Sequence, residues 1–343
     1  MTAAIRSDSS PRPLTGVRWL VAWTIFPLVL GLSLVACVIA LRGGASPGWT
    51  VLAISLIAGA VLLVAERLQP HATYWLQPQR DVATDVTHAV LSSLLVPAMF
   101  EAAVASLLLA GAVWISTLVG VSLWPAAWPL GVQLALALLV AELGQYWWHR
   151  LAHRHDALWR FHATHHSSRR LYWLNSCRFH PVDSMAQYTL EAAPLVLLGC
   201  PAEVLALFTL STAVIGMFQH ANIELRCGVF NWVFSLTELH RWHHSRDLRE
   251  GNSNFGANLI VWDVLFGTRF LPADRELAAE NVGLAGMPQF PRTYWGQITS
   301  PFRWKTLRET TSPRRDESQQ PEPAKRTAPA EPVAAATFNR RSA

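Results

Sequence analysis

Long apolar runs dominate this sequence and restrict the folds that it can adopt. Residues 17–41 are nearly all apolar, and a helix of this length crosses a bilayer with some tilt. The chain is 51% apolar and only 15% charged, and its charged residues cluster outside the runs. Because a backbone in lipid must satisfy its own hydrogen bonds, the runs predict an all-α integral membrane protein built on a transmembrane helical bundle.

Two further runs follow the first one. Residues 49–65 predict a second span. Residues 89–124 would make roughly 54 Å of helix at about 1.5 Å per residue, which is too long for one crossing. Pro97 and Glu101 divide this run, and we expect an interfacial portion followed by a span at 102–121, although two spans remain open.

The later apolar runs fix how often the chain crosses. Residues 128–148 predict a helix that ends where the first cluster of histidines begins. Residues 185–198 and 202–218 are shorter and are joined by Gly-Cys-Pro, so we expect a helical hairpin that dips into the membrane. An even number of crossings between the histidine clusters would leave all of them on one side.

Basic residues give the expected orientation. Arg6, Arg12 and Arg18 precede the first span and only Arg42 follows it, which places the N-terminus in the cytosol. A membrane surface explains these basic residues better than nucleic acid does. We expect four regions, with both termini and the histidine-rich domain cytosolic: a polar tail at 1–14, transmembrane helices at 15–148, a histidine-rich metal domain at 149–305 that includes a membrane hairpin at about 185–219, and a disordered tail at 306–343.

Eight of the chain's 13 histidines lie in three short clusters. On a helix, residues three or four apart share a face, so the histidines of one cluster can point at one location. Adjacent histidines instead diverge by about 100° and can serve two neighbouring metal ions. The clusters, which predict a dinuclear metal centre, are His149 and His153, then His162, His165 and His166, and then His240, His243 and His244.

The number of histidines bears on which metal binds. Imidazole suits zinc, copper, iron and nickel, so the ligand type alone does not choose. Zinc sites use three or four protein ligands, which eight histidines exceed. Two iron ions with higher coordination numbers would use them and leave room for O2, so the count favours iron.

The clusters, in the order HxxxH, HxxHH and HxxHH after membrane spans, resemble those of the fatty acid hydroxylase and sterol desaturase superfamily. The similarity also includes Arg178-Phe179-His180-Pro181, His220-Ala-Asn222, Asn254-Phe-Gly256 and the Trp262–Thr268 segment. The resemblance implies a membrane-bound di-iron enzyme that uses O2 and two electrons to hydroxylate or desaturate a lipid. It also implies that the eight histidines are iron ligands, with His180 and His220 as further ligands or close neighbours.

Some polar residues are placed around the metal centre by spacing alone. Glu142 lies seven residues before His149, and Asp247 lies four residues after His243, so both are candidates to orient ligating imidazoles. Three other histidines are expected to have no metal role: His155, which is off the face shared by the first cluster, and His71 and His88, which stand at membrane edges.

The chain carries no GxGxxG segment and no cysteine set for an iron–sulfur cluster. We therefore expect electrons from a separate ferredoxin or cytochrome b5-type donor. The arginines that could receive an acidic donor are Arg150, Arg154, Arg160, Arg169 and Arg170, although anchoring to the membrane explains them equally well. A zinc-dependent hydrolase and a non-catalytic metal-binding membrane protein are the alternatives, and the sequence does not select the lipid or decide between hydroxylation and desaturation.

Overall fold

The computed structural model describes residues 14–120 and 123–309, and for residues 101–106 it describes the backbone. Glu101 and most of the two expected polar tails therefore lie outside what is described. The α-helices are α1 (Gly16–Arg42), α2 (Pro47–Leu68), α3 (Val82–Thr87), α4 (Val96–Val119), α5 (Leu130–Arg154), α6 (Asp156–His166), α7 (Pro181–Leu197), α8 (Ala202–His220), α9 (Thr237–His243), α10 (Leu248–Gly251), α11 (Val261–Leu265), α12 (Tyr294–Thr299) and α13 (Trp304–Glu309).

Short helical turns and loops complete the described chain. The turns are η1 (Thr73–Leu76), η2 (His88–Leu95, a π-helix), η3 (Trp173–Cys177), η4 (Gly228–Trp232), η5 (Ala279–Asn281) and η6 (Ser300–Arg303). Pairing between extended segments is limited to isolated bridges such as the one between Pro70 and Ile223, and residues 14–120 and 123–309 contain no strand. The predicted all-α membrane fold is confirmed.

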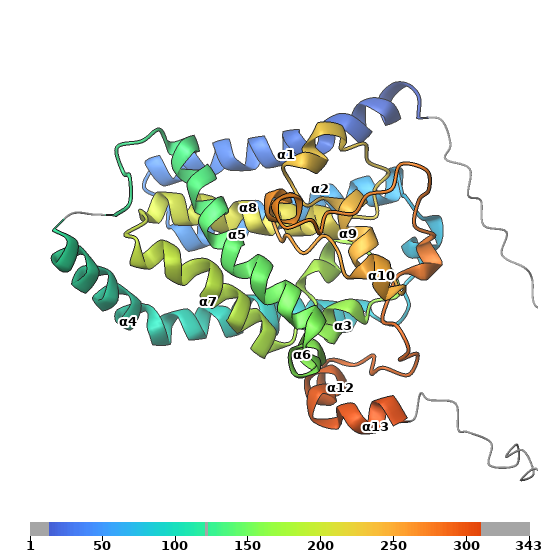
Figure 1. Cartoon of the computed structure of the whole chain (residues 1–343). Coiled ribbons are helices and arrows are strands. Elements are labelled where there is room, and N and C mark those ends of the chain that lie inside the picture. The colour runs from blue at the N-terminus through green and yellow to red at the C-terminus, as the bar shows by residue number, and fades with distance from the viewer. Residues whose placement is uncertain (1–13, 121–122, 310–343) are drawn as a thin grey trace, which may run out of the picture. The chain divides into compact units, whose positions relative to one another are not determined.

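Three pairs of consecutive helices that run in opposite directions make up the bundle: α1 and α2, α4 and α5, and α7 and α8 (Figure 1). α1 packs against α2, whereas α4 and α5 each pack against α7. In each pair the first helix ends and the second begins at the end of the bundle on the left in Figure 1. The helices that carry the histidine clusters, α5, α6 and α9, meet at the opposite end, which α8 also reaches with its last residue. Each pair leaves this end and returns to it, as the expected even number of crossings requires.

Five helical segments are long and apolar enough to cross a membrane. Three of them agree with predicted spans, 16–42, 47–68 and 130–154, and 202–220 agrees with the second helix of the predicted membrane hairpin. The fifth, 82–100, stops at residues 101–106, of which only the backbone is described, and Leu107–Val119 follows as a shorter apolar helix. These segments do not test the span expected at 102–121, but the expected division of the run at Pro97 differs from the structure.

The difference arises because Pro97 does not interrupt the helix. Residues 82–119 run as one continuous helical rod of α3, η2 and α4, and Pro97 stands in the first turn of α4. A proline lacks an N–H group and displaces a carbonyl one turn earlier, and the wider π-helical turns of η2 lie where that displacement falls. The expected interfacial portion is therefore part of the same helix as the rest of the run.

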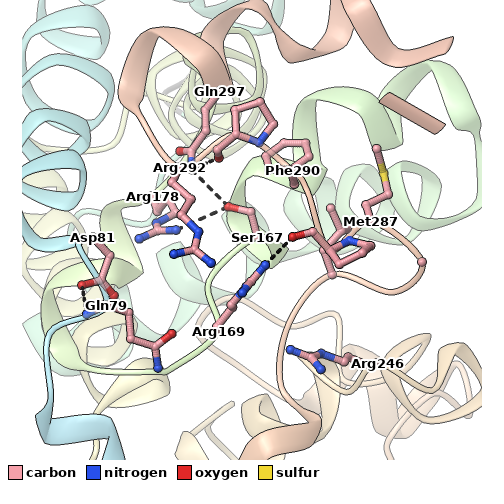
Figure 2. A pocket seen from close by; sticks show the side chains of 14 residues that line it. Gln79, Asp81, Ser167, Arg169, Arg178, Arg246, Met287, Phe290, Arg292 and Gln297 are labelled. Carbon is pink, nitrogen blue, oxygen red and sulfur yellow. Dashed lines mark hydrogen bonds between the residues drawn. The ribbon is translucent and has the colours of Figure 1, made fainter. Parts of the chain in front are cut away.

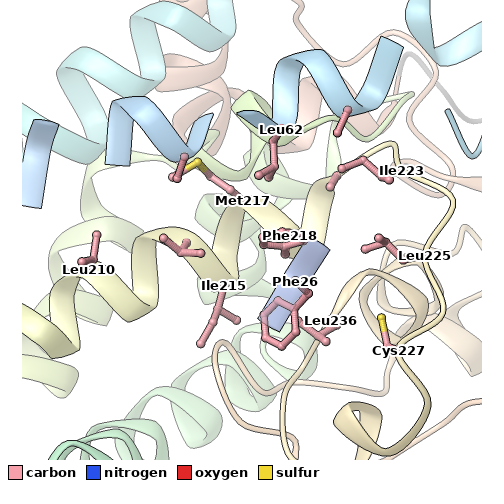
Figure 3. Packing of buried hydrophobic residues seen from close by; sticks show 14 of the residues in the cluster. Phe26, Leu62, Leu210, Ile215, Met217, Phe218, Ile223, Leu225, Cys227 and Leu236 are labelled. Atoms are coloured by element: carbon pink, nitrogen blue, oxygen red, sulfur yellow. The ribbon is translucent and has the colours of Figure 1, made fainter. Parts of the chain in front are cut away.

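α8 forms the centre of the bundle and packs against α1, α2 and α5. Figure 3 shows Phe218 of α8 enclosed by Phe26 of α1, Leu62 of α2 and Leu236 from the segment before α9. The rings of Phe26 and Phe218 meet edge to face, with centroids 5.2 Å apart. This packing places the end of α8, which carries His220, among the other histidine-bearing segments.

α5 and α7 approach each other closely at a glycine of α5, Gly144. A Cβ atom at Gly144 would lie 2.9 Å from the backbone oxygen of Leu190, whereas one at Gly216 in α8 would meet nothing within 4 Å. We expect Gly144→Ala to lower the unfolding free energy by about 1–3 kcal/mol because the helices must separate. Gly216→Ala should leave it unchanged or raise it. Thermal unfolding in detergent micelles measures both, and equal stabilities would contradict the close approach of α5 to α7.

Candidate metal centre

Nine histidines form two groups at the end of the bundle where α5, α6 and α9 meet. Within each group the candidate ligand nitrogens all lie within 4.8 Å of one another. Eight of the nine side chains are buried and His153 is half-buried. The first group consists of His149, His153, His162, His166 and His243, and the second consists of His165, His220, His240 and His244.

Neighbouring histidines divide between the groups. His165 belongs to the second group and His166 to the first, and His244 and His243 are divided in the same way. This is the arrangement that the roughly 100° offset between successive helical residues predicts. The structure thus brings together the eight histidines of the three clusters and His220, and a metal-binding role for each of them stays a prediction.

Backbone carbonyls fix the tautomer of two histidines in the first group. His149 donates from Nδ1 to the carbonyl of Phe255 at 2.6 Å, and His243 donates from Nδ1 to the carbonyl of Ser253 at 2.8 Å. A carbonyl oxygen only accepts, so the ring proton sits on Nδ1 and the Nε2 lone pair is free. The two Nε2 atoms are buried and make no hydrogen bond with the described residues.

Side-chain oxygens orient three more rings. His162 Nδ1 lies 2.9 Å from the Asp183 carboxylate, His220 Nδ1 lies 2.8 Å from Asn175 Oδ1, and His153 Nδ1 lies 3.1 Å from Asn252 Oδ1. Nδ1 of the remaining second-group histidines, His165, His240 and His244, is buried without a hydrogen-bond partner in the described chain. The first group is therefore the more firmly oriented of the two.

The Nε2 atoms lie at the spacing expected around a metal ion. His166 Nε2 is 3.1 Å from that of His153 and 3.2 Å from that of His162. In the second group His244 Nε2 is 3.0 Å from that of His240. At a metal–nitrogen distance of about 2.1 Å, neighbouring ligands of one six-coordinate ion lie about 3.0 Å apart. The residues fit one metal ion in each group, and five nitrogens in the first group exceed what a four-coordinate zinc ion uses.

The rings are in the form that binds metal. Burial, followed by the neighbouring histidines, holds the pKa of His165, His166, His243 and His244 well below the ordinary histidine value. The imidazoles are therefore neutral at pH 7, and neutral imidazole is a metal ligand. Buried lone pairs with no proton between them repel one another, and a cation at each centre would remove that repulsion.

Comparisons with known proteins agree with this geometry. Residues 134–268 match the family model described as fatty acid hydroxylase. An ornithine lipid hydroxylase of Rhizobium tropici is 35% identical over 292 residues, which cover 83% of this chain and 85% of that protein. The chain belongs to the fatty acid hydroxylase family. It is an oxidoreductase of the lipid-hydroxylating class.

More distant relatives match a shorter part of this chain. The alkylglycerol monooxygenase of Danio rerio is 31% identical over 42% of this chain and 31% of its own length. The human alkylglycerol monooxygenase is 30% identical over 38% of this chain and 29% of its own length. No solved structure matches the chain.

His180 lies outside both groups, although it was named as a candidate ligand. It caps α7 by accepting a hydrogen bond from the backbone N–H of Val182 at Nδ1, and Nε2 lies 3.0 Å from the carbonyl of Ile298. Both ring nitrogens therefore have backbone partners, which leaves no lone pair for a metal. A residue between two histidine clusters in sequence is here directed away from them by the start of a helix.

The two carboxylates chosen by spacing do not touch a histidine in the structure. Glu142 accepts hydrogen bonds from the backbone N–H groups of Ala257 and Asn258, and so holds the loop whose Phe255 carbonyl orients His149. Asp247 caps α10 and pairs with Arg249. Glu142 acts on the site through a loop, and Asp247 has no such connection.

The histidines expected to have no metal role lie outside the two groups as well. His155 joins α5 to α6 and is exposed. His71 lies 3.1 Å from Glu224, and His88 is held between Gln297 and the carbonyl of Phe179.

Sequence reasoning missed Asp183 and Asn175. Asp183 lies 21 residues from His162, with a turn and the start of α7 between them, so helical spacing could not connect the two. Asp183 also accepts a hydrogen bond from Trp148 Nε1 at 2.8 Å, which fixes the carboxylate. The available signal was the aspartate in the first turn of a helix that begins His-Pro, directly after the second cluster.

Asp183→Asn is expected to loosen metal binding about 10–100-fold. Asparagine offers one accepting oxygen, so either Trp148 or His162 would face an N–H group. Asp247→Asn is the matched control, because asparagine also caps a helix and the residue does not contact a histidine. Iron retained after dialysis against a chelator measures the effect, and equal retention by the two variants would refute the role of Asp183.

Proposed function

We propose that this protein is a non-haem di-iron monooxygenase that uses O2 to hydroxylate a membrane lipid. One iron ion would be held by the five histidines of the first group and the other by the four histidines of the second group. The observation that carries the proposal is the convergence of nine imidazoles on two neighbouring points, where adjacent Nε2 atoms lie 3.0–3.2 Å apart, in a chain that belongs to a hydroxylase family. Family membership favours this function over the zinc hydrolase and the metal store.

Iron supplies the activation of O2 when it is bound, and the protein's own residues supply the surroundings. The carbonyls of Phe255 and Ser253 and the carboxylate of Asp183 hold imidazole rings in fixed tautomers. Burial of eight of the nine rings excludes water from the reacting positions. The site closes one end of a bundle of apolar helices, so a lipid chain can approach it from the membrane (Figure 1).

The relatives favour hydroxylation over desaturation, since those named above are hydroxylases or monooxygenases. Among them, the ornithine lipid hydroxylase matches over most of both chains, whereas the alkylglycerol monooxygenase of Danio rerio matches under a third of its own length. We therefore propose an aminoacyl lipid of the ornithine-lipid class as the substrate in preference to an alkylglycerol.

We propose that the metal end of the bundle faces the cytosol and receives electrons from a separate donor protein. The excess of arginines before the first span supports this orientation. The five arginines considered for donor docking are not equivalent, because Arg170 is buried and ion-paired with Asp81 and is unavailable to a partner. Arg154 is exposed at the end of α5 and remains a candidate contact.

Lipid profiling by mass spectrometry tests the function. Cells that express the wild-type chain should accumulate a lipid heavier by one oxygen atom, whereas desaturation would make it lighter by two hydrogens. His149→Ala in the first group and His220→Ala in the second should each lower the product by more than about 100-fold, because each removes a ligand. His155→Gln is the control and should retain activity, since His155 is exposed and outside both groups. Normal product from either alanine variant would refute the proposal.

A further inference from the structure

A pocket lined by arginines lies beside the histidine groups and has no part in the function proposed above. Its volume is about 260 Å³, and Arg169, Arg178, Arg246 and Arg292 line it. Figure 2 shows Arg169, Arg178 and Arg292 gathered around Ser167. The volume suits a headgroup-sized molecule and is too small for a whole two-chain lipid.

The pocket is built from the segments that directly follow two histidine clusters. Ser167 comes one residue after His166, and Arg246 comes two residues after His244. Gln297 of α12 closes another side and lies 3.4 Å from Ser167 Oγ. A molecule bound in the pocket would therefore lie next to the segments that hold both metal groups.

The pocket carries positive charge that nearby carboxylates do not balance. Asp81, its one acidic lining residue, is already bound by Arg170 at 2.7 and 2.9 Å. Arg178 is taken by Asp85 at 2.6 Å. In contrast, no carboxylate in the described chain forms an ion pair with the other three lining arginines, Arg169, Arg246 and Arg292.

Arg169 is the central member of this set. It is half-buried and donates to the carbonyl of Pro288, which fixes its guanidinium beside the cavity. Burial, and then the charges of Arg292 and Arg246, lower the pKa of Arg169. Like charges held together in this way repel one another, and a bound anion would relieve the repulsion.

Apolar residues form another part of the pocket wall. They are Leu284, Met287, Phe290 and two prolines, Pro288 and Pro291. Next to them, α12 exposes Trp295 with 71% of its surface accessible, and an exposed tryptophan is typical of a membrane–water interface. An anion with an apolar body attached fits this mixed lining of arginines and apolar residues better than a free inorganic ion does.

We propose that this pocket binds the oxyanion, a carboxylate or phosphate, of a lipid headgroup. The inference rests on the proposed function in that the bound lipid is then the substrate, held by its headgroup beside the metal centre. Arg169 and Arg292 bind the oxyanion, and the apolar wall contacts the part of the lipid that follows it. This assigns selection of the lipid class to the arginines and leaves the histidines to the reaction.

Equilibrium binding tests the pocket without turnover. The iron-loaded full chain in uncharged detergent micelles is titrated calorimetrically with N-dodecanoylglycine, with its methyl ester, and with inorganic phosphate. We expect the acid to bind about tenfold more tightly than the ester, since only the acid carries the oxyanion. Phosphate should bind more weakly than the acid because it leaves the apolar wall unfilled.

Three arginine variants locate the binding. Arg292→Gln and Arg169→Gln should each weaken binding of the acid about tenfold. Arg154→Gln removes the same charge from an exposed position outside the pocket and should change binding less than twofold. Arg292 is exposed, so its variant keeps the test valid even if replacing Arg169 disturbs folding. Unchanged iron content in each variant shows that the metal centre is intact.

Four outcomes would overturn the proposal. The first is equal binding of the acid and the ester, and the second is phosphate binding as tight as that of the acid. The third is a loss of acid binding in Arg154→Gln equal to that in the pocket variants. The fourth is that the pocket variants bind the acid normally but accept electrons slowly from an acidic donor. The second would assign the pocket to a free oxyanion and the last to donor docking. Arginine-dependent binding by a chain that makes no hydroxylated lipid would refute the proposed function and leave the pocket assignment standing.

Discussion

The structure depends on one electrostatic constraint: nine imidazole rings bring ring nitrogens toward two points, and neither Nε2 of His149 nor Nε2 of His243 carries a proton. His149 and His243 cannot relieve this by changing tautomer, because their protons are held by the carbonyls of Phe255 and Ser253. Cations can satisfy such a set, whereas additional protons would be buried as unpaired charge. The three helix pairs are arranged so that every contributing segment reaches the same end of the bundle.

Buried carboxylates hold the loops around the histidine groups in place. Glu66 of α2 accepts hydrogen bonds from the backbone N–H groups of Trp173 and Asn222, and so ties together the segments that carry Asn175 and His220. Asp263 accepts those of Phe255 and Gly256, and Glu142 accepts those of the next two residues. These carboxylates satisfy backbone groups that would otherwise be unpaired inside the protein, and so they position the carbonyl that orients His149.

The sequence predicted the features that follow from local periodicity. Apolar runs gave four of the five candidate spans, and the offset between adjacent histidines predicted their division between two groups. The errors arose where distant contacts decide the outcome. Pro97 was expected to divide a run that continues as one helix through a π-helical stretch, and His180, named as a further ligand or close neighbour, caps α7. Asp183 reaches His162 only because α6 and α7 pack together, and no spacing rule encodes that contact.

The central claim is that the two histidine groups hold one iron ion each. Anomalous diffraction recorded on both sides of the iron absorption edge, from crystals of the purified protein, tests it most directly. The account predicts two iron peaks, one within Nε2 contact of His149, His162 and His243 and the other within Nε2 contact of His165, His220 and His240. Both peaks should appear above the iron edge and disappear below it. A single peak shared by the two groups, or a group without an iron peak, would contradict the assignment.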